Sequence, residues 1–128
     1  MERKIYKELL NWKNRVMKKP LMVVGARQIG KTYIINEFCN KEFEEYIYIN
    51  LLEENEIVKI FEEKINTQEK FNRLKIYLDK DINLEKTIIF FDEVQVSENF
   101  IVSLKYFNES EKPYKIVCAG SLLRSKDN

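Results

Sequence analysis

The fold is decided by a short apolar run and the glycine-bounded loop that follows it, Leu21-Met22-Val23-Val24-Gly25-Ala26-Arg27-Gln28-Ile29-Gly30-Lys31-Thr32. The last eight of these residues match the pattern G-x-x-x-x-G-K-[ST], which is typical of a loop that binds phosphate groups. The apolar run predicts a buried strand before the loop, and the apolar spacing after it predicts a helix to about Asn40. Because the motif requires this context, the sequence predicts a phosphate-binding loop.

The loop offers several kinds of phosphate ligand. Its backbone N–H groups are expected to face a β-phosphate, aided by the positive end of the following helix dipole. The Lys31 ammonium would reach the β- and γ-phosphates, and the Thr32 hydroxyl would bind Mg²⁺. Gly25 and Gly30 are expected to permit turns that a Cβ would block. The candidate nucleotide-binding residues are Gly25, Ala26, Arg27, Gln28, Ile29, Gly30, Lys31, Thr32 and Tyr33.

A second apolar run, Thr87-Ile88-Ile89-Phe90-Phe91, ends in the acidic pair Asp92-Glu93. Asp92, at the carboxyl end of a buried strand, can hold the ligand shell of Mg²⁺. Glu93 beside it can polarise an attacking water and accept its proton. A strand that ends in acidic loop residues is common in α/β proteins, but the phosphate loop upstream favours the catalytic interpretation.

A third apolar run, Lys115–Ala119, leads into Gly120-Ser121. Ligands of α/β proteins bind where the strands end, so Ser121 is a candidate contact for a γ-phosphate or for the attacking water. The alternative is a small-residue turn that satisfies only the backbone. With Lys31 and Glu93, Ser121 completes the predicted catalytic set.

Composition excludes several other classes of protein. The 128 residues suffice for one domain, and 22 Lys and Arg against 21 Asp and Glu give a net charge of +1, which indicates neither a nucleic-acid nor a membrane partner. No apolar run approaches the roughly 20 residues that span a bilayer. Without histidine the chain has no Ser-His or Cys-His pair. Cys39 and Cys118, with no C-x-x-C spacing, argue against zinc and are expected to be reduced thiols in the cytoplasm.

The periodicity of apolar residues predicts the element order α-β-α-β-α-α-β-α-β. Alternating helices and unbroken apolar strands are typical of an α/β fold whose parallel sheet is covered on both faces. Residues 1–19 are expected to form an N-terminal helix that packs on this core. The charged region from Glu53 to Lys86 is expected to hold two helices with solvated faces rather than a binding patch.

Three features of the nucleotide site have alternative interpretations. No Asn-Lys-x-Asp motif is present, which favours ATP over GTP. Trp12 is expected to be either a core residue, the more common case for an apolar-stripe tryptophan, or part of an adenine pocket. Arg27 and Gln28 are candidates to contact phosphate or a neighbouring subunit, and a surface salt bridge is the other interpretation for Arg27.

The phosphate loop occurs here with three further segments, Tyr48-Ile49-Asn50-Leu51, Asp92-Glu93-Val94-Gln95 and Ala119-Gly120-Ser121-Leu122-Leu123. Together they resemble bacterial and archaeal AAA-type ATPases that usually carry a C-terminal domain of unknown function. The resemblance covers nearly the whole chain. It implies a P-loop NTPase three-layer sandwich with a parallel sheet, with ATP as ligand, Mg²⁺ as cofactor and Asp92 and Thr32 as metal ligands.

The resemblance also implies what the 128 residues do not include. Members of the family continue with another strand, a helical lid and a further domain, so the chain is expected to be a single, partial ATPase domain truncated after its fourth strand. The last strand is expected to lie centrally, leaving Leu21–Val24 at an edge. A missing C-terminal part or a second copy would cover that edge. The region in which such families place an arginine finger is also absent.

Because the 128 residues are expected to lack the lid and the arginine finger, we expect weak or no ATP turnover by the isolated chain. The alternative function is a module that binds nucleotide without hydrolysing it, or an interaction module. A small-molecule kinase is a further alternative, but kinases usually lack the glutamate directly after the Asp92 position and carry arginine-rich lids.

Overall fold

The computed structural model describes residues 2–15, 19–25 and 30–121. The elements, in chain order, are α1 (Glu2–Asn14), β1 (Leu21–Gly25), α2 (Lys31–Glu42), β2 (Glu45–Asn50), α3 (Asn55–Glu62), α4 (Thr67–Leu78), β3 (Thr87–Asp92), the 3-10 turn η1 (Val94–Val96), α5 (Glu98–Asn108) and β4 (Ile116–Ser121). The predicted order of helices and strands is confirmed. The short turn η1 was not predicted.

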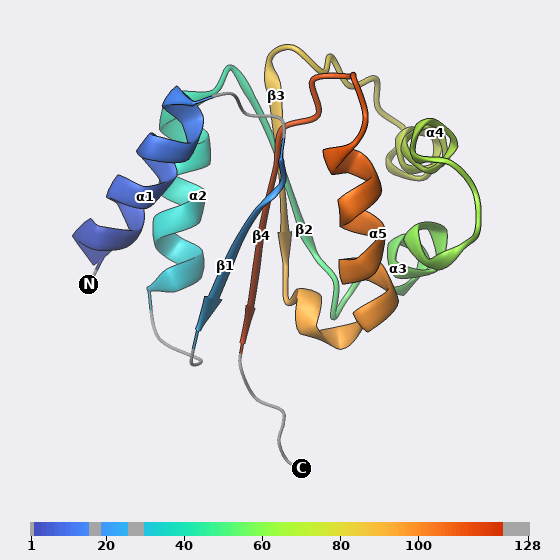
Figure 1. Cartoon of the computed structure of the whole chain (residues 1–128), viewed down its shortest axis with the longest axis horizontal. Helices are drawn as coiled ribbons and strands as arrows, with labels where there is room; N and C mark the ends of the chain where they lie inside the picture. Colours follow the sequence, from blue (N-terminus) through green and yellow to red (C-terminus); the bar gives the residue numbers. More distant parts are fainter. Residues whose placement is uncertain (1, 16–18, 26–29, 122–128) are drawn as a thin grey trace.

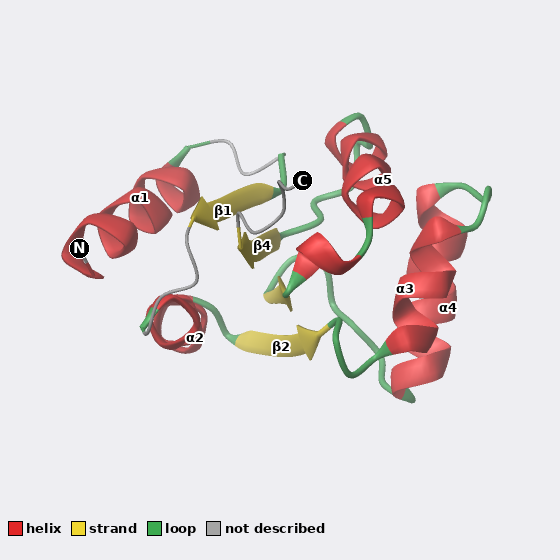
Figure 2. Ribbon diagram, turned by 90° about the horizontal axis from the view of Figure 1, so that it is seen from below, coloured by secondary structure: helices red, strands yellow, loops and turns green. Residues whose placement is uncertain are grey.

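The four strands form one parallel sheet in the order β1-β4-β3-β2. The last strand of the chain, β4, therefore lies between β1 and β3, as the family resemblance implied. Because all strands run in the same direction, their carboxyl ends share one edge, at the bottom of Figure 1 and facing the viewer in Figure 2. This edge is also where α2 begins, and it positions the candidate site.

Helices cover both faces of the sheet, which gives the three layers seen in Figure 1. α1 and α2 lie on one face, and α3, α4 and α5 lie on the other. Alternate strand residues contribute to the two cores, since successive side chains of a strand point to opposite faces. Ile88 and Phe90 join the core beside α1 and α2, whereas Ile89 and Phe91 join the core beside α3 and α5. The predicted α/β three-layer fold is confirmed.

Local side chains fix where two of the helices begin. The Asn66 side chain accepts a hydrogen bond from the Glu69 N–H at 2.8 Å at the start of α4, and Ser97 Oγ accepts one from the Phe100 N–H at 2.9 Å at the start of α5. Each cap satisfies a backbone donor that has no acceptor within its helix. α5 therefore begins directly after Ser97.

Two predicted boundaries need correction. The helix expected within residues 1–19 ends at Asn14, and Leu9 of this helix is buried in the core beside α2. Trp12 donates from Nε1 to the Lys19 carbonyl at 2.9 Å and lies 6.5 Å from the Phe38 ring, as its interpretation as a core residue requires. The last strand extends to Ser121, because residues 117–121 pair with β1. Gly120 and Ser121 are therefore strand residues rather than a turn after the strand.

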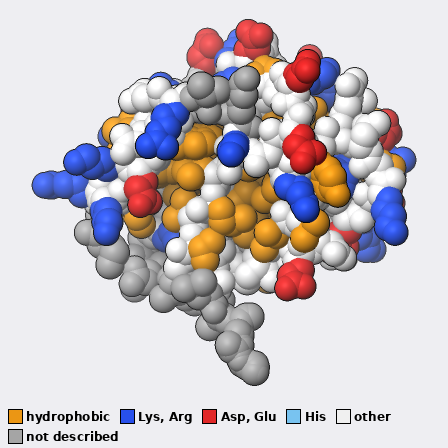
Figure 3. Space-filling model, in the orientation of Figure 1, with side chains coloured by type: hydrophobic (Ala, Val, Ile, Leu, Met, Phe, Trp, Pro, Cys, Tyr) orange, Lys and Arg blue, Asp and Glu red, His pale blue; other side chains and the backbone are white. Residues whose placement is uncertain are grey.

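The β1 strand forms one end of the sheet, as predicted for Leu21–Val24. In the described part of the chain it pairs with β4 alone. Val24 is 49% exposed, and hydrophobic side chains gather on the face of the molecule shown in Figure 3.

None of the helices in the described residues has the length and apolar character needed to cross a bilayer.

Candidate functional site

The site begins where the phosphate loop turns into α2. Gly30, the N-cap of this helix, has φ 105°, a left-handed conformation that disfavours any residue with a Cβ. Lys31 and Thr32 follow as the first two residues of the helix. The first N–H groups of a helix have no acceptor within it, and the helix dipole makes this end positive. The start of α2 is therefore suited to an anion.

The Asp92 carboxylate joins α2 to the two strands β2 and β3. Its Oδ2 accepts a hydrogen bond from Thr32 Oγ1 at 2.9 Å and another from the Tyr48 hydroxyl at 2.8 Å. Asp92 is the last residue of β3 and is buried. Burial, followed by the hydrogen bond to Asp92, raises the pKa of Tyr48 above its ordinary value, so near neutral pH the phenol stays protonated and donates to the carboxylate.

Glu93 lies directly after β3 in a left-handed conformation, with φ 61°. Its Oε1 accepts a hydrogen bond from Gln95 Nε2 at 2.8 Å. The Gln95 carboxamide oxygen in turn accepts one from the Ser121 N–H at 3.1 Å. Gln95, a residue of η1, thus connects the candidate general base to the end of β4.

The end of β4 also contacts Lys31. Lys31 Nζ donates a hydrogen bond to the Gly120 carbonyl at 2.7 Å. The Ser121 hydroxyl oxygen is buried and has no hydrogen-bond partner among the residues that the structure describes. A buried hydroxyl without a partner is costly, so Ser121 stays a candidate contact for a ligand at the strand ends.

Comparison with known proteins identifies the family of this chain. The sequence model of a family described as "AAA domain" matches residues 17–127, nearly the whole chain. This chain belongs to the AAA domain family. It is also 33% identical over 107 residues to an uncharacterised protein, MJ1544, of Methanocaldococcus jannaschii. That match covers 83% of this chain but only 22% of the archaeal protein.

In this AAA domain the fold brings together five of the residues predicted from the sequence. These residues lie at the same edge of the sheet: Lys31 and Thr32 begin α2, Asp92 ends β3 and is followed by Glu93, and Ser121 ends β4. Their contacts join residues up to 89 positions apart.

The structure supports fewer of the other residues predicted in the loop. Ala26, Arg27, Gln28 and Ile29 lie outside the described residues, so the interpretations of Arg27 and Gln28 stay predictions. Tyr33 is 66% exposed, and its predicted role in nucleotide binding stays a prediction. The left-handed conformation of Gly30 supports the glycine argument there. A Cβ added at Gly25 would meet no atom within 4 Å among the described residues, so for Gly25, which precedes the undescribed part of the loop, the argument stays a prediction.

Two residues at the site of this AAA domain were not among the predicted site residues, Tyr48 and Gln95. Tyr48 lies in a β-rich run whose alternation predicts only a strand, and its register opposite Phe90 depends on the fold. Gln95 belongs to the Asp92-Glu93-Val94-Gln95 segment, but only the turn η1 returns its side chain to Glu93.

A separate cavity of about 840 Å³ lies between the α3–α4 turn and α5. It is lined by residues such as Lys70, Ser103 and Tyr106, and by none of the predicted site residues. The chemistry of the strand ends therefore does not extend into it.

Proposed function

We propose that this AAA domain binds ATP with Mg²⁺ at the carboxyl ends of its strands, and that the protein to which it belongs hydrolyses ATP there. The observation that carries the proposal is the contact of Thr32 with Asp92, 2.9 Å between oxygens of residues 60 positions apart. A hydroxyl and a carboxylate held together beside the start of a helix match the donor set expected of a Mg²⁺-nucleotide site.

The residues present suit Mg²⁺. This ion prefers oxygen ligands and usually binds through one or two protein groups together with phosphate oxygens and water. Thr32 Oγ1 and Asp92 would hold it, and Tyr48 would orient the carboxylate through its hydrogen bond. When bound, Mg²⁺ would offset the charge that develops on the phosphate oxygens.

The protein's own groups then have separate roles. Lys31 would bind the β- and γ-phosphates, and its present contact with the Gly120 carbonyl keeps the ammonium at the site. The buried Ser121 hydroxyl would donate to the γ-phosphate or to the attacking water. Glu93 would orient that water for in-line attack and accept its proton.

A second candidate function is nucleotide binding without hydrolysis. The observation that favours it is the bond of the Glu93 carboxylate to Gln95, which occupies one oxygen of the candidate base. The match also covers only 22% of the archaeal relative, so hydrolysis by a whole protein is a separate proposal from nucleotide binding by this domain. The small-molecule kinase alternative gains no support from these contacts.

Calorimetric titration with ATP and Mg²⁺ tests the proposal. The wild-type chain is expected to bind with a dissociation constant on the order of micromolar, and Lys31→Ala is expected to abolish measurable binding. Lys41→Ala is the matched control, because Lys41 lies on the same helix in an exposed ion pair with Glu37. No binding by a folded wild-type chain, or equal loss in both variants, would contradict the site.

Turnover separates the two candidate functions. We expect the 128-residue chain alone to show weak or no hydrolysis, and Glu93→Gln to bind Mg²⁺-ATP as the wild type does. Appreciable turnover by the chain that disappears in Glu93→Gln would overturn the first expectation and assign hydrolysis to this domain by itself. Turnover retained in Glu93→Gln would remove Glu93 from the mechanism.

The partners we propose are ATP and a covering segment for the open edge of β1, either from the rest of the protein or from a second copy. Light scattering with and without ATP distinguishes these sources. A cytoplasmic location is part of the same proposal, and it is supported by Cys39 and Cys118, which are both buried free thiols.

A further inference from the structure

A single peptide group at the end of β4 contacts both halves of the candidate site. Its carbonyl, on Gly120, accepts a hydrogen bond from the Lys31 ammonium at 2.7 Å. Its N–H, on Ser121, donates to the Gln95 carboxamide oxygen at 3.1 Å. The phosphate-binding lysine and Gln95 are therefore bonded to opposite ends of the same amide.

Gln95 also contacts the candidate general base, because its Nε2 donates a hydrogen bond to Glu93 Oε1 at 2.8 Å. A carboxylate can only accept a hydrogen bond and a backbone N–H can only donate one. A side chain that bonds to both must carry a donor and an acceptor, as a carboxamide does. Neither a carboxylate nor an apolar side chain at position 95 could make both contacts.

The backbone around Gln95 is shaped for this contact. A Cβ added at Gly120 would lie 3.0 Å from Val94 Cγ2 and 3.2 Å from Gln95 Oε1, so glycine permits η1 to approach β4 this closely. Glu93 adopts its left-handed conformation directly before η1. The chain thus accepts an unfavourable conformation at Glu93 where the turn that carries Gln95 begins.

We propose that Gln95 is a positioning residue in a hydrogen-bonded relay, Lys31 to the 120–121 peptide group to Gln95 to Glu93, through which phosphate bound at Lys31 is sensed at Glu93. The inference rests on the proposed function for the identity of the ligand. It adds that Gln95 holds Glu93 while the site is empty and holds it less strongly when Lys31 binds phosphate.

The physical basis is the polarisation of the shared amide. A carbonyl that accepts from an ammonium makes the N–H of the same peptide group a stronger donor, and hydrogen bonds in a chain strengthen one another by perhaps 10–30% each. A phosphate that attracts the Lys31 ammonium weakens its bond to the Gly120 carbonyl. The Ser121 N–H then becomes a weaker donor to Gln95, and Gln95 a weaker donor to Glu93.

The relay can be tested without nucleotide, by NMR of the ¹⁵N-labelled chain. Lys31→Met removes the charged donor, so the Ser121 amide proton and the Gln95 side-chain amide protons are expected to shift upfield in the free protein. Lys41→Met is the control, and it is expected to leave these signals in place. If the signals of Ser121 and Gln95 are the same in Lys31→Met as in the wild type, the relay is wrong.

Addition of Mg²⁺-ATP to the wild-type chain is the second arm. The same signals are expected to move in the same direction as in Lys31→Met. Binding that leaves them unmoved would overturn the relay and leave the proposed function intact. Absence of binding would contradict the proposed function, whereas the comparison of Lys31→Met with Lys41→Met still decides the relay.

Hydrogen exchange at the Ser121 amide distinguishes positioning from simple packing. Gln95→Met removes the acceptor and is expected to speed exchange up to about tenfold, the loss of one hydrogen bond. Gln95→Glu keeps an acceptor oxygen but sets a second carboxylate against Glu93, so it is expected to restore only part of the protection at Ser121. Equal exchange in wild type and Gln95→Met would contradict the assigned contact.

Discussion

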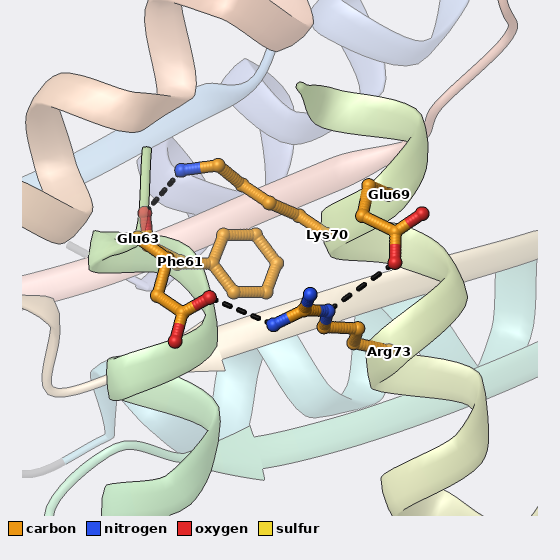
Figure 4. Close-up of polar contacts among 5 residues, drawn as sticks. All are labelled: Phe61, Glu63, Glu69, Lys70 and Arg73. Carbon is orange, nitrogen blue, oxygen red and sulfur yellow. Dashed lines mark hydrogen bonds and ion pairs between the residues drawn. The ribbon is translucent and has the colours of Figure 1, made fainter. Parts of the chain in front are cut away.

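Two polar clusters of this molecule look alike as sets of charges but are built differently. The first, here called the strand-edge cluster, consists of Lys31, Thr32, Tyr48, Asp92, Glu93 and Gln95. The second, the hairpin cluster, consists of Glu63, Glu69, Lys70 and Arg73 at the α3–α4 hairpin (Figure 4). Both contain a lysine bonded to a backbone carbonyl and carboxylates bonded to side-chain donors.

The contacts of the hairpin cluster are local in sequence. Arg73 bonds to Glu63 at 2.7 Å and to Glu69 at 3.2 Å, over separations of 10 and 4 residues. Lys70 is only 5% exposed and donates to the Phe61 carbonyl, near the carboxyl end of α3 (Figure 4). These contacts fasten one helix of the hairpin to the next and satisfy a helix end.

The contacts of the strand-edge cluster span 89, 60 and 44 residues for Lys31, Thr32 and Tyr48, respectively. Only the assembled sheet brings these groups together, and beside them the Ser121 hydroxyl stays buried without a partner among the described residues. The comparison teaches that the candidate ligand site differs from the hairpin cluster in its long-range assembly rather than in its charge. Substitutions in each cluster can test this distinction.

Asp92→Asn is expected to have the largest effect. The amide keeps the size of the carboxylate but removes the charge that would hold Mg²⁺, so affinity for Mg²⁺-ATP should fall roughly 100-fold, equivalent to about 2.7 kcal/mol. Calorimetry measures this loss. Tyr48→Phe is the matched control, because it removes one hydrogen bond to Asp92 and should weaken binding less than about tenfold. Unchanged affinity in Asp92→Asn would place the metal elsewhere.

Lys70→Met should leave nucleotide binding unchanged and lower the free energy of unfolding by about 1 kcal/mol at pH 7, because the Phe61 carbonyl loses its donor. Burial lowers the pKa of Lys70 below its ordinary value of 10.5. Between the folded-state pKa and 10.5 the unfolded chain binds more protons, so the stability of the wild type rises with pH across that window.

Chemical denaturation at several alkaline pH values checks this second prediction. The difference in unfolding free energy between the wild type and Lys70→Met should grow as the pH rises toward 10.5. A difference that shrinks over this range would show that the Lys70 ammonium is not held in a poorly solvated place.

Arg73→Ala should have the smallest effect. Its two ion pairs are exposed, with 43% of the arginine side chain accessible, and exposed pairs typically contribute about 0–1 kcal/mol. The loss of stability, measured by thermal or urea unfolding, should shrink further at high salt. A loss of unfolding free energy above about 2 kcal/mol would show that the two ion pairs of Arg73 are not the weak, exposed contacts that their geometry indicates.

Much of the fold follows from the sequence because its signals are local. The unbroken apolar run of β3 predicts a strand buried on both faces, and all six of its residues are buried. The Ser97 cap of α5 also follows from nearby residues. The extension of β4 through Ser121 does not, because it depends on pairing with β1, almost a hundred positions earlier in the chain.

The residues of the candidate site also divide into those with a local sequence signal and those whose place depends on the fold. Lys31, Thr32, Asp92 and Glu93 could be predicted because each belongs to a motif with fixed spacing. Tyr48 could not, since nothing in an alternating β-rich run distinguishes a surface phenol from one that bonds to Asp92 across two strands. The role of Gln95 as a connection to the Ser121 N–H likewise depends on the strand order, which places β4 beside η1.

The left-handed backbone conformation of Glu93 lowers stability at a position whose side chain is proposed to act in catalysis. A residue with a Cβ pays about 1–2 kcal/mol for this conformation, and glycine avoids most of that cost. A screen for heat-resistant variants of this chain should therefore enrich Glu93→Gly, which would discard the candidate general base. Resistance to heat gained at position 93 would come with loss of the chemistry proposed for the site, so selection for the two properties would act in opposite directions here.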